Sequence, residues 1–224
     1  ELPTLRIVLP SQMCDPLKAN AYYHRYLDEW QLADELGFDI MVNEHHSTAT
    51  SLTASANVIL SILARITKRA RLLVLGVPVA NRPDPIRVAE EMAMIDVISG
   101  GRLELGMIKG VPYEIAPANS NPVGLMERYW EAHDLIVAAM TNTAEVFSWE
   151  GEHFSYRNVS LWPPPQQRPH PPVWMTASSA ASAAKTVARS CSAFTGRPAP
   201  FSARWIVSAS TAMPAWRCEV SSRR

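Results

Sequence analysis

Apolar and polar residues alternate along the chain in blocks that predict strands followed by helices. Short apolar runs, of the length expected for buried strands, occupy residues 5–10, 38–42, 72–79, 102–108 and 173–176. Apolar residues at three- and four-residue spacing, which is typical of amphipathic helices, occupy residues 22–36, 54–67, 85–98, 126–140 and 179–189. Because strands and helices follow one another in series, the pattern predicts an α/β fold with a parallel sheet and right-handed crossovers.

Two segments depart from this alternation. Residues 146–157 alternate on either side of a central Glu150-Gly151 pair, which predicts a β-hairpin. Residues 109–125 are rich in Pro, Asn and Gly and are too long for a simple connector, so we expect a functional or mobile loop there. Asp84 and Pro85 have the residue types of a helix cap and a first helical position.

The five strand–helix units fit either an incomplete TIM-like (β/α)8 barrel or an open doubly wound sheet. No Gly-x-Gly-x-x-Gly motif follows the first predicted strand, which disfavours a dinucleotide-binding sheet. The units end at about residue 189, so we assign residues 1–189 to this fold.

Residues 190–224 differ in composition from the rest of the chain. From residue 191 onward there is one acidic residue, Glu219, against five arginines, with much Ser, Ala and Pro and no amphipathic period. Ile206 and Val207 are the best candidates there for a short strand. We hypothesise that this tail is foreign to the fold, being disordered or read out of frame.

The composition is that of a globular protein, with 47% hydrophobic and 19% charged residues. Lys+Arg and Asp+Glu both number 21, and this balance argues against nucleic acid as a partner. No apolar run reaches the roughly 18 residues that span a membrane, and no signal peptide is recognisable, so we expect a cytoplasmic protein. The three cysteines, Cys14, Cys191 and Cys218, are too few and too scattered to predict disulfides or a zinc site.

The strongest candidate for chemistry is Glu44-His45-His46, at the end of the second predicted strand. Parallel sheets bind ligands beyond the carboxyl ends of their strands. Adjacent strand residues point to opposite faces, so we expect only one histidine to face a pocket, where it could move a proton near neutral pH. The alternative is that both histidines are structural and bond to loop carbonyls. The spacing does not favour a metal site.

Three further strand ends carry weaker signals. Gly76-Val77 would allow close approach of a ligand or of another strand. Lys109 follows the fourth predicted strand, where it either binds an anion or is simply solvated. Ser178 and Ser179 precede the last predicted helix, where they suit either a phosphate or ordinary helix capping.

In this order, the motifs together resemble the bacterial luciferase-like monooxygenase family over about residues 5–189. The matching segments are residues 33–39 with Glu44-His45-His46, Gly76-Val77, residues 84–91, Asp96 with residues 99–106, the hairpin at 149–154, and residues 172–174. The resemblance implies a TIM-like (β/α)8 barrel that binds reduced FMN at its C-terminal face. It further implies a flavin C4a-peroxide, formed with O2, that oxygenates a small organic substrate. A separate flavin reductase and a dimer are the partners that it implies.

The resemblance also assigns roles to residues. It makes His45 the catalytic residue, and it places the cofactor against Glu44, His46, Gly76, Val77, Lys109, Ser178 and Ser179. A non-proline cis peptide of the family corresponds to the bond between Gly76 and Val77. Lys109 stands where the family has a phosphate-binding arginine, and Ser178-Ser179 stand where it has a Glu-Ser pair, so both positions depart from the family pattern.

Two alternatives remain open at this point. One is an oxidoreductase of the same superfamily that uses the deazaflavin F420, although Glu44-His45-His46 favours FMN. The other is a non-catalytic flavin-binding or inert remnant, because family members carry further strand–helix units that residues 190–224 do not match.

Overall fold

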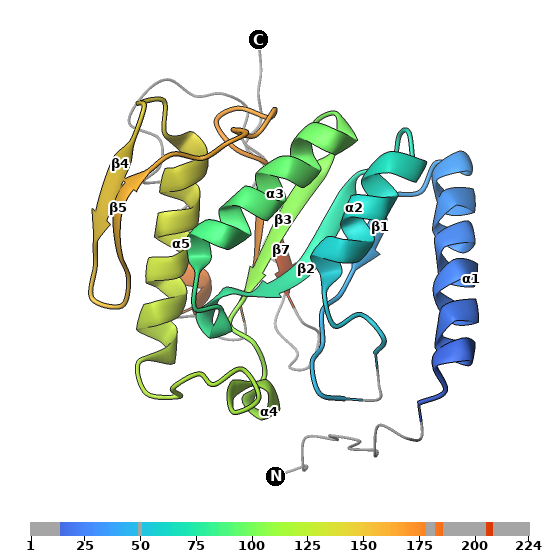
Figure 1. The fold of residues 1–224 in the computed structure, drawn as a ribbon, viewed down its shortest axis with the longest axis horizontal. Coiled ribbons are helices and arrows are strands. Elements are labelled where there is room, and N and C mark those ends of the chain that lie inside the picture. Colours follow the sequence, from blue (N-terminus) through green and yellow to red (C-terminus); the bar gives the residue numbers. More distant parts are fainter. Residues whose placement is uncertain (1–13, 49–50, 178–181, 186–204, 208–224) are drawn as a thin grey trace.

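The computed structural model describes residues 14–48, 51–177, 182–185 and 205–207 (Figure 1). The helices are α1 (Pro16–Glu35), α2 (Ala56–Ile66), the 3₁₀ helix η2 (Val79–Asn81), α3 (Pro85–Ser99), α4 (Pro112–Ile115) and α5 (Leu125–Thr141). The strands are β1 (Ile40–Val42), β2 (Leu72–Pro78), β3 (Leu103–Ile108), β4 (Phe147–Glu150), β5 (Ser155–Val159), β6 (Val173–Ala177) and β7 (Trp205–Val207).

Five of these strands form one parallel sheet in the order β1-β2-β3-β6-β7. The predicted α/β fold with a parallel sheet is therefore confirmed. A full barrel is not shown, because the described strands form an open row with β1 and β7 at its edges. The strand predicted at residues 5–10 lies outside the described residues, as does most of the helix predicted at 179–189.

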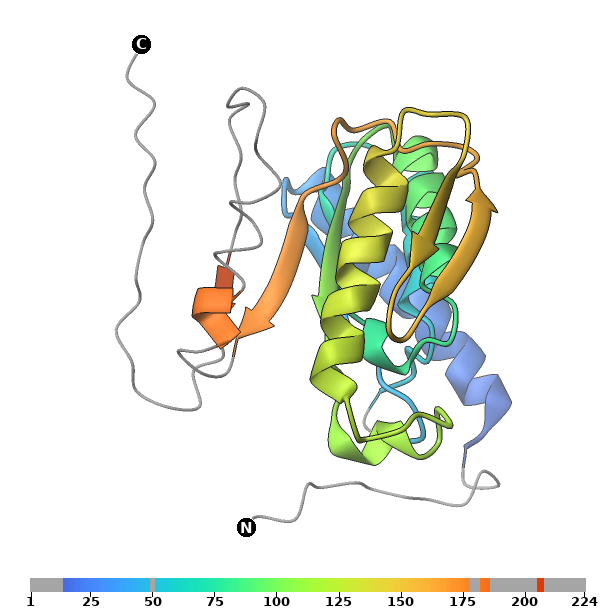
Figure 2. The same cartoon turned by 90° about the vertical axis from the view of Figure 1, so that its left-hand side faces the viewer.

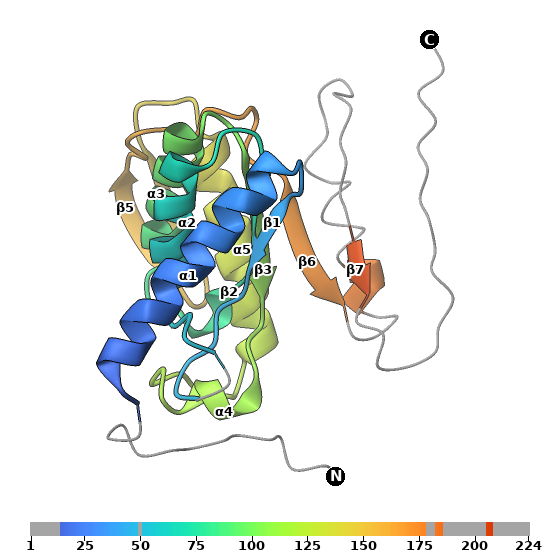
Figure 3. The ribbon, with the colours of Figure 1, turned by 90° about the vertical axis from the view of Figure 1, so that its right-hand side faces the viewer.

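The helices α1, α2, α3 and α5 lie on the same side of the sheet, and the hairpin β4–β5 lies outside them (Figures 2 and 3). The core fills the space between these helices and the sheet. Its largest fully buried side chains include Leu60, Leu63, Leu72, Met92, Leu103, Leu105, Leu135 and Ile136. Alternate residues of β2 are less covered, because they point to the opposite face of the sheet.

One predicted boundary was wrong by more than two residues, and one segment predicted as a loop contains a helix. Helix α1 begins at Pro16 rather than at residue 22, because Asp15 caps it by accepting the N–H of Leu17 at 2.9 Å. Its first turns are exposed and lack apolar periodicity, so the sequence pattern did not reveal them.

The segment at 109–125 is not all loop, because it contains the short helix α4. The predicted hairpin is confirmed as the antiparallel pair β4–β5.

A buried carboxylate joins α1 to the turn that leads into β2. Asp34 accepts the backbone N–H groups of Lys68, Arg69 and Ala70 at 2.8, 2.8 and 2.5 Å. Burial alone raises the pKa of this carboxyl, but the three N–H donors and the positive charge of Arg102 outweigh it. The pKa of Asp34 therefore lies below its ordinary value.

We predict that Asp34→Asn lowers the free energy of unfolding by about 1–3 kcal/mol at pH 7, because the charged acceptor is lost. A lowered pKa means that the charged carboxylate stabilises the fold above pH 3.8, its ordinary value, and that this contribution is lost as the pH falls through the native pKa. The difference in the free energy of unfolding between Asp34→Asn and the wild type should therefore become smaller in acid. Urea unfolding at several pH values measures it. Asp28→Asn, exposed on the same helix, is the control. A pH-independent difference for Asp34→Asn would contradict the assignment.

Candidate functional site

The carboxyl ends of β1, β2 and β3 meet at one edge of the sheet, the lower edge in Figure 1, beside α4. Strand β1 ends at Val42, so Glu44-His45-His46 lie in the loop that follows it. The alternation of side chains along a strand therefore does not govern the two histidines, contrary to the expectation from the sequence. Both imidazole rings instead contact buried carboxylates.

Glu44 is the first of these carboxylates, and its side chain is fully buried. Its Oε1 accepts from Arg82 Nη2 at 2.6 Å and contacts His46 Nε2 at 3.0 Å. Its Oε2 accepts the N–H of Ala56 at 3.0 Å, at the N-terminus of α2. A buried carboxylate needs such donors to offset the loss of hydration. Glu44 thereby joins the loop after β1 to α2 and to the segment after β2.

Glu114, on α4, is the second carboxylate and is also buried. Its Oε1 accepts the backbone N–H of His46 at 2.9 Å and lies 3.3 Å from His45 Nδ1. The two histidine side chains stay about one-third exposed, at 33% for His45 and 30% for His46. Neither ring bonds a loop carbonyl in these contacts, so carboxylates and not carbonyls hold both histidines.

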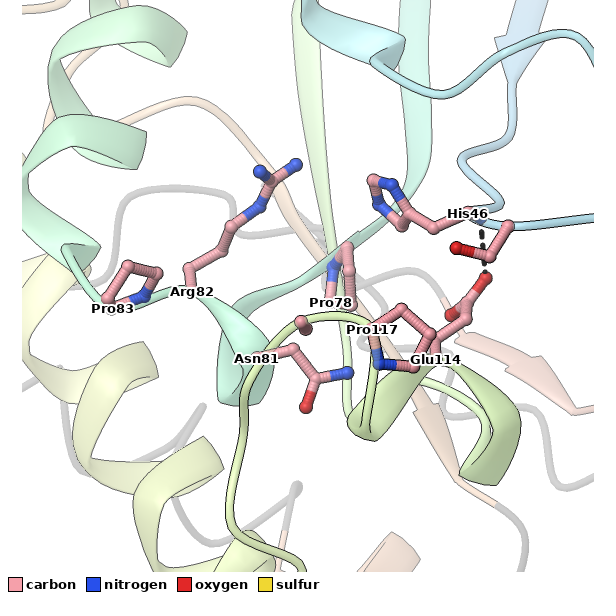
Figure 4. A pocket seen from close by; sticks show the side chains of 9 residues that line it. His46, Pro78, Asn81, Arg82, Pro83, Glu114 and Pro117 are labelled. Atoms are coloured by element: carbon pink, nitrogen blue, oxygen red, sulfur yellow. Dashed lines mark hydrogen bonds between the residues drawn. The ribbon is translucent and has the colours of Figure 1, made fainter.

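A pocket of about 270 Å³ opens beside this cluster (Figure 4). It is lined by His46, Ser47, Pro78, Asn81, Arg82, Pro83, Glu114, Pro117 and Ala118. His45 is not among the residues that line it. Figure 4 shows the side chains of His46 and Arg82 above Asn81 and Glu114, with proline rings between them. The walls therefore combine apolar surfaces with a few hydrogen-bonding groups, as small-molecule sites do.

The residues Asn81, Arg82 and Glu114 were not singled out from the sequence. Asn81 is 7% exposed, and within the described part of the chain neither its amide nitrogen nor its amide oxygen has a hydrogen-bond partner. The Nε of Arg82 is likewise buried without one. A buried polar atom without a hydrogen bond costs folding free energy unless a ligand or a water molecule supplies the missing bond. The available signal was position alone, because all three residues stand in segments that follow the carboxyl ends of β2 and β3.

Gly76 lies where β2 packs closely against β3. A Cβ at this position would lie 2.8 Å from Ile108 Cγ2 and 2.9 Å from the carbonyl oxygen of Gly106, so only glycine fits. A non-proline cis peptide is present, but it joins Leu75 to Gly76, so the bond expected between Gly76 and Val77 was wrong by one position. The cis bond falls inside the stretch from Val74 to Val77 where the pairing of β2 with β3 is irregular. Close strand packing accounts for Gly76 without a ligand.

The other candidate residues lie apart from the pocket or outside the described residues. Val77 is fully buried in the core. Lys109 is exposed immediately after β3, at the same edge of the sheet as the pocket. Ser178 and Ser179 follow β6, which ends at Ala177, and lie outside the described residues.

Two further properties of the described residues bear on the kind of site. In that part of the chain, no group of three or more His, Cys, Asp or Glu side chains is placed to hold a metal ion. Among the helices described, none combines the length and the hydropathy that crossing a membrane requires.

Comparison with known families and proteins gives consistent matches. The family described as "Luciferase-like monooxygenase" matches residues 5–206. An uncharacterized protein, y4wF, of Sinorhizobium fredii is 36% identical over 190 residues, which are 80% of this chain and 55% of that protein. The oxygenase component of the flavin-dependent trigonelline monooxygenase of Acinetobacter baylyi is 33% identical over 161 residues, which are 69% of this chain and 43% of that protein.

Solved structures show the same fold. The monooxygenase RslO1 from Streptomyces bottropensis is 26% identical with a TM-score of 0.70, over 77% of this chain and 52% of that one. The oxygenating constituent of 3,6-diketocamphane monooxygenase from Pseudomonas putida, in complex with FMN, is 18% identical with a TM-score of 0.62, over 70% of this chain and 47% of that one. An F420-dependent secondary alcohol dehydrogenase with an F420-acetone adduct is 17% identical with a TM-score of 0.64, over 72% of this chain and 50% of that one. The chain spans about half the length of the curated relatives it matches.

We predict that Glu44→Ala lowers the free energy of unfolding by about 3 kcal/mol, because it leaves the guanidinium of Arg82 and the N–H of Ala56 without their acceptor. Urea unfolding of the full chain measures the loss. Glu29→Ala is the matched control, since Glu29 pairs with Arg25 only on the exposed surface of α1 and should cost less than about 1 kcal/mol. Similar losses in the two variants would show that Glu44 does not hold the site together.

Proposed function

Because this chain belongs to the luciferase-like monooxygenase family, we propose that it acts in a flavin-dependent monooxygenase that uses reduced FMN and O2 to oxygenate a small organic substrate. The observation that carries the proposal is the cluster of Glu44, Arg82, His46 and Glu114 at the carboxyl edge of the sheet. Sites in α/β folds lie at this edge. The cluster also borders a pocket with the mixed lining of a small-molecule site.

The residues around the pocket fit a flavin. The apolar faces of Pro78, Pro83 and Pro117 can pack against a heteroaromatic ligand. The amide of Asn81, which has no hydrogen-bond partner among the described residues, suits the polar edge of such a ligand. In this proposal His46 contacts the ring from the pocket wall. Glu44 holds His46 in place, and Gly76 and Val77, packed within β2, act through the position of the strand that leads to Pro78. Lys109, with Ser178 and Ser179, would hold the phosphate. A reduced flavin, when bound, supplies the electrons with which O2 is activated.

The protein's own part is to orient groups and handle protons. We assign His45 the catalytic role, because its ring is held by a buried carboxylate and yet is about one-third exposed. An imidazole can hold or transfer a proton in catalysis. His46, braced between Glu44 and Glu114, shapes the pocket wall beside it.

The solved structures with this fold are compatible with two cofactors. One solved structure of this fold is a complex with FMN and another is a complex with an F420-acetone adduct. Glu44-His45-His46 and the flavin-dependent relative from Acinetobacter favour FMN. An F420-dependent oxidoreductase is the second candidate.

The proposal includes partners besides the substrate and O2. A separate flavin reductase is part of it, because the Acinetobacter relative is named as an oxygenase component. A second copy of the chain is also part of it, supported by apolar side chains exposed on α2 and α3, namely Val58, Ile62, Met94, Val97 and Ile98. We place the enzyme in the cytoplasm, where reduced thiols are the norm.

The test is an anaerobic titration of the purified chain with FMNH2 and with F420H2, followed by exposure to O2. The proposal expects FMNH2 to bind and to be consumed in an oxygen-dependent reaction. Preferential binding of F420H2 would favour the second candidate, and binding of neither would reject both.

We predict that His45→Ala lowers oxygen-dependent turnover by about 100-fold, within the range expected for loss of a general acid–base, while flavin affinity changes by less than about threefold. Stopped-flow kinetics and a binding titration on the same preparation measure the two quantities. His24→Ala, exposed on α1, is the control and should change neither. Equal loss of turnover and binding in His45→Ala would point to a structural histidine.

A further inference from the structure

Glu114 contacts both histidines although it lies far from them in the sequence. It stands on α4, in the segment between β3 and α5, and its carboxylate is almost fully buried. One oxygen, Oε1, meets both the backbone N–H of His46, at 2.9 Å, and Nδ1 of His45, at 3.3 Å. The contact between α4 and the loop after β1 is therefore made at the histidines themselves.

We propose that Glu114 is a positioning residue that fixes His45 in the tautomer with its proton on Nδ1, so that Nε2 is left as a proton acceptor. The complementary part of the proposal is that Glu44 fixes His46 in the opposite tautomer, with its proton on Nε2. The role in turnover rests on the proposed function, because His45 acts there as the proton-transferring group. The tautomers themselves do not depend on it.

The tautomer of His45 follows from the hydrogen bonds that Glu114 can make. Oε1 already accepts the peptide N–H of His46, so this oxygen presents lone pairs to its neighbours. The proposal takes Glu114 to be ionised, and an ionised carboxylate only accepts hydrogen bonds. The ring nitrogen that faces it must then carry the proton, and in a neutral imidazole the other nitrogen is an acceptor.

The tautomer of His46 follows from the same reasoning at Glu44. That carboxylate is anionic, because the guanidinium of Arg82 donates to Oε1 at 2.6 Å and the N–H of Ala56 donates to Oε2. Nε2 of His46 lies 3.0 Å from Oε1 and must donate to it. Two adjacent histidines are thus held by two carboxylates from different elements, each through a different ring nitrogen.

In this arrangement Glu114 determines which ring nitrogen of His45 can accept a proton. A general base oriented by a second residue through its other nitrogen is a recurring arrangement in enzymes. Here Glu114 holds Nδ1, and the ring of His45 is exposed enough for Nε2 to meet a ligand or water. Without Glu114, the ring would be free to rotate and to exchange tautomers, and Nε2 would often carry the proton instead.

The experiment is long-range ¹H–¹⁵N correlation NMR of the ring nitrogens of the full chain without flavin, with signals assigned from His45→Gln and His46→Gln. The wild type should show protonated Nδ1 at His45 and protonated Nε2 at His46. Glu114→Ala should shift His45 toward protonated Nε2 and leave the pattern of His46 unchanged, since Glu44 still holds that ring. Glu152→Ala, an exposed glutamate of the hairpin turn, is the matched control and should change neither.

Protonated Nε2 at His45 in the wild type, or an unchanged His45 in a folded Glu114→Ala variant, would overturn the assignment. Glu114→Gln retains an oxygen that can accept both N–H groups and should restore the wild-type tautomer. If Glu114→Ala does not fold, the wild-type and Glu114→Gln spectra still decide, because the tautomer is read directly in each.

Turnover provides the second readout. Glu114→Ala should lower oxygen-dependent turnover by 10- to 100-fold with flavin affinity nearly unchanged, and Glu114→Gln should recover part of it. Combining Glu114→Ala with His45→Ala should cost no more than His45→Ala alone, because the two act as one unit. Additive losses would overturn the positioning role. If no flavin binds, the proposed function fails while the tautomer result stands.

Discussion

The arrangement of the site depends on keeping the charge of Glu44 buried. A carboxylate without water around it is tolerated only where donors surround it, and here these come from Arg82, Ala56 and His46. They belong to three segments that are separate in sequence: the loop after β1, the start of α2 and the loop before α3. The electrostatic requirement of one side chain therefore sets how the ends of β1 and β2 are joined.

The segment after β3 extends this network to a second carboxylate. Glu114 brings α4 against the histidines. Arg128 of α5 holds the rest of the segment in place. Arg128 donates to the carbonyl of Ala80 at 2.8 Å, to Ser120 Oγ at 2.7 Å and to the carbonyl of Asn121 at 2.6 Å. A segment that reads as an irregular loop is thus tied on both sides to the walls of the pocket. The histidines consequently sit in a framework of charged hydrogen bonds, which favours fixed ring orientations over mobile ones.

Much of the fold could be predicted because the relevant signals are local. The apolar runs of β2 and β3, buried under helices, and the hairpin β4–β5 are patterns of neighbouring residues. The start of α1 was missed because the cap formed by Asp15 and Pro16 precedes exposed turns without periodicity. Helix α4 was missed because four residues are too few to show a helical period. Sequence motifs also located Glu44-His45-His46 correctly at a carboxyl end.

The sequence by itself determined the order of the elements, the parallel sheet and the family, because these follow from local periodicity and from motifs read in series. Only the tertiary structure decided which residues meet at the site. Glu44 lies 38 residues from Arg82, and His46 lies 68 residues from Glu114, so no local pattern relates them. Nor could the sequence tell that Asn81 is buried with no hydrogen-bond partner in the described part of the chain, or which nitrogen of each histidine faces a carboxylate. Burial and direction of side chains are properties of packing between distant segments, and packing is what the folded chain adds.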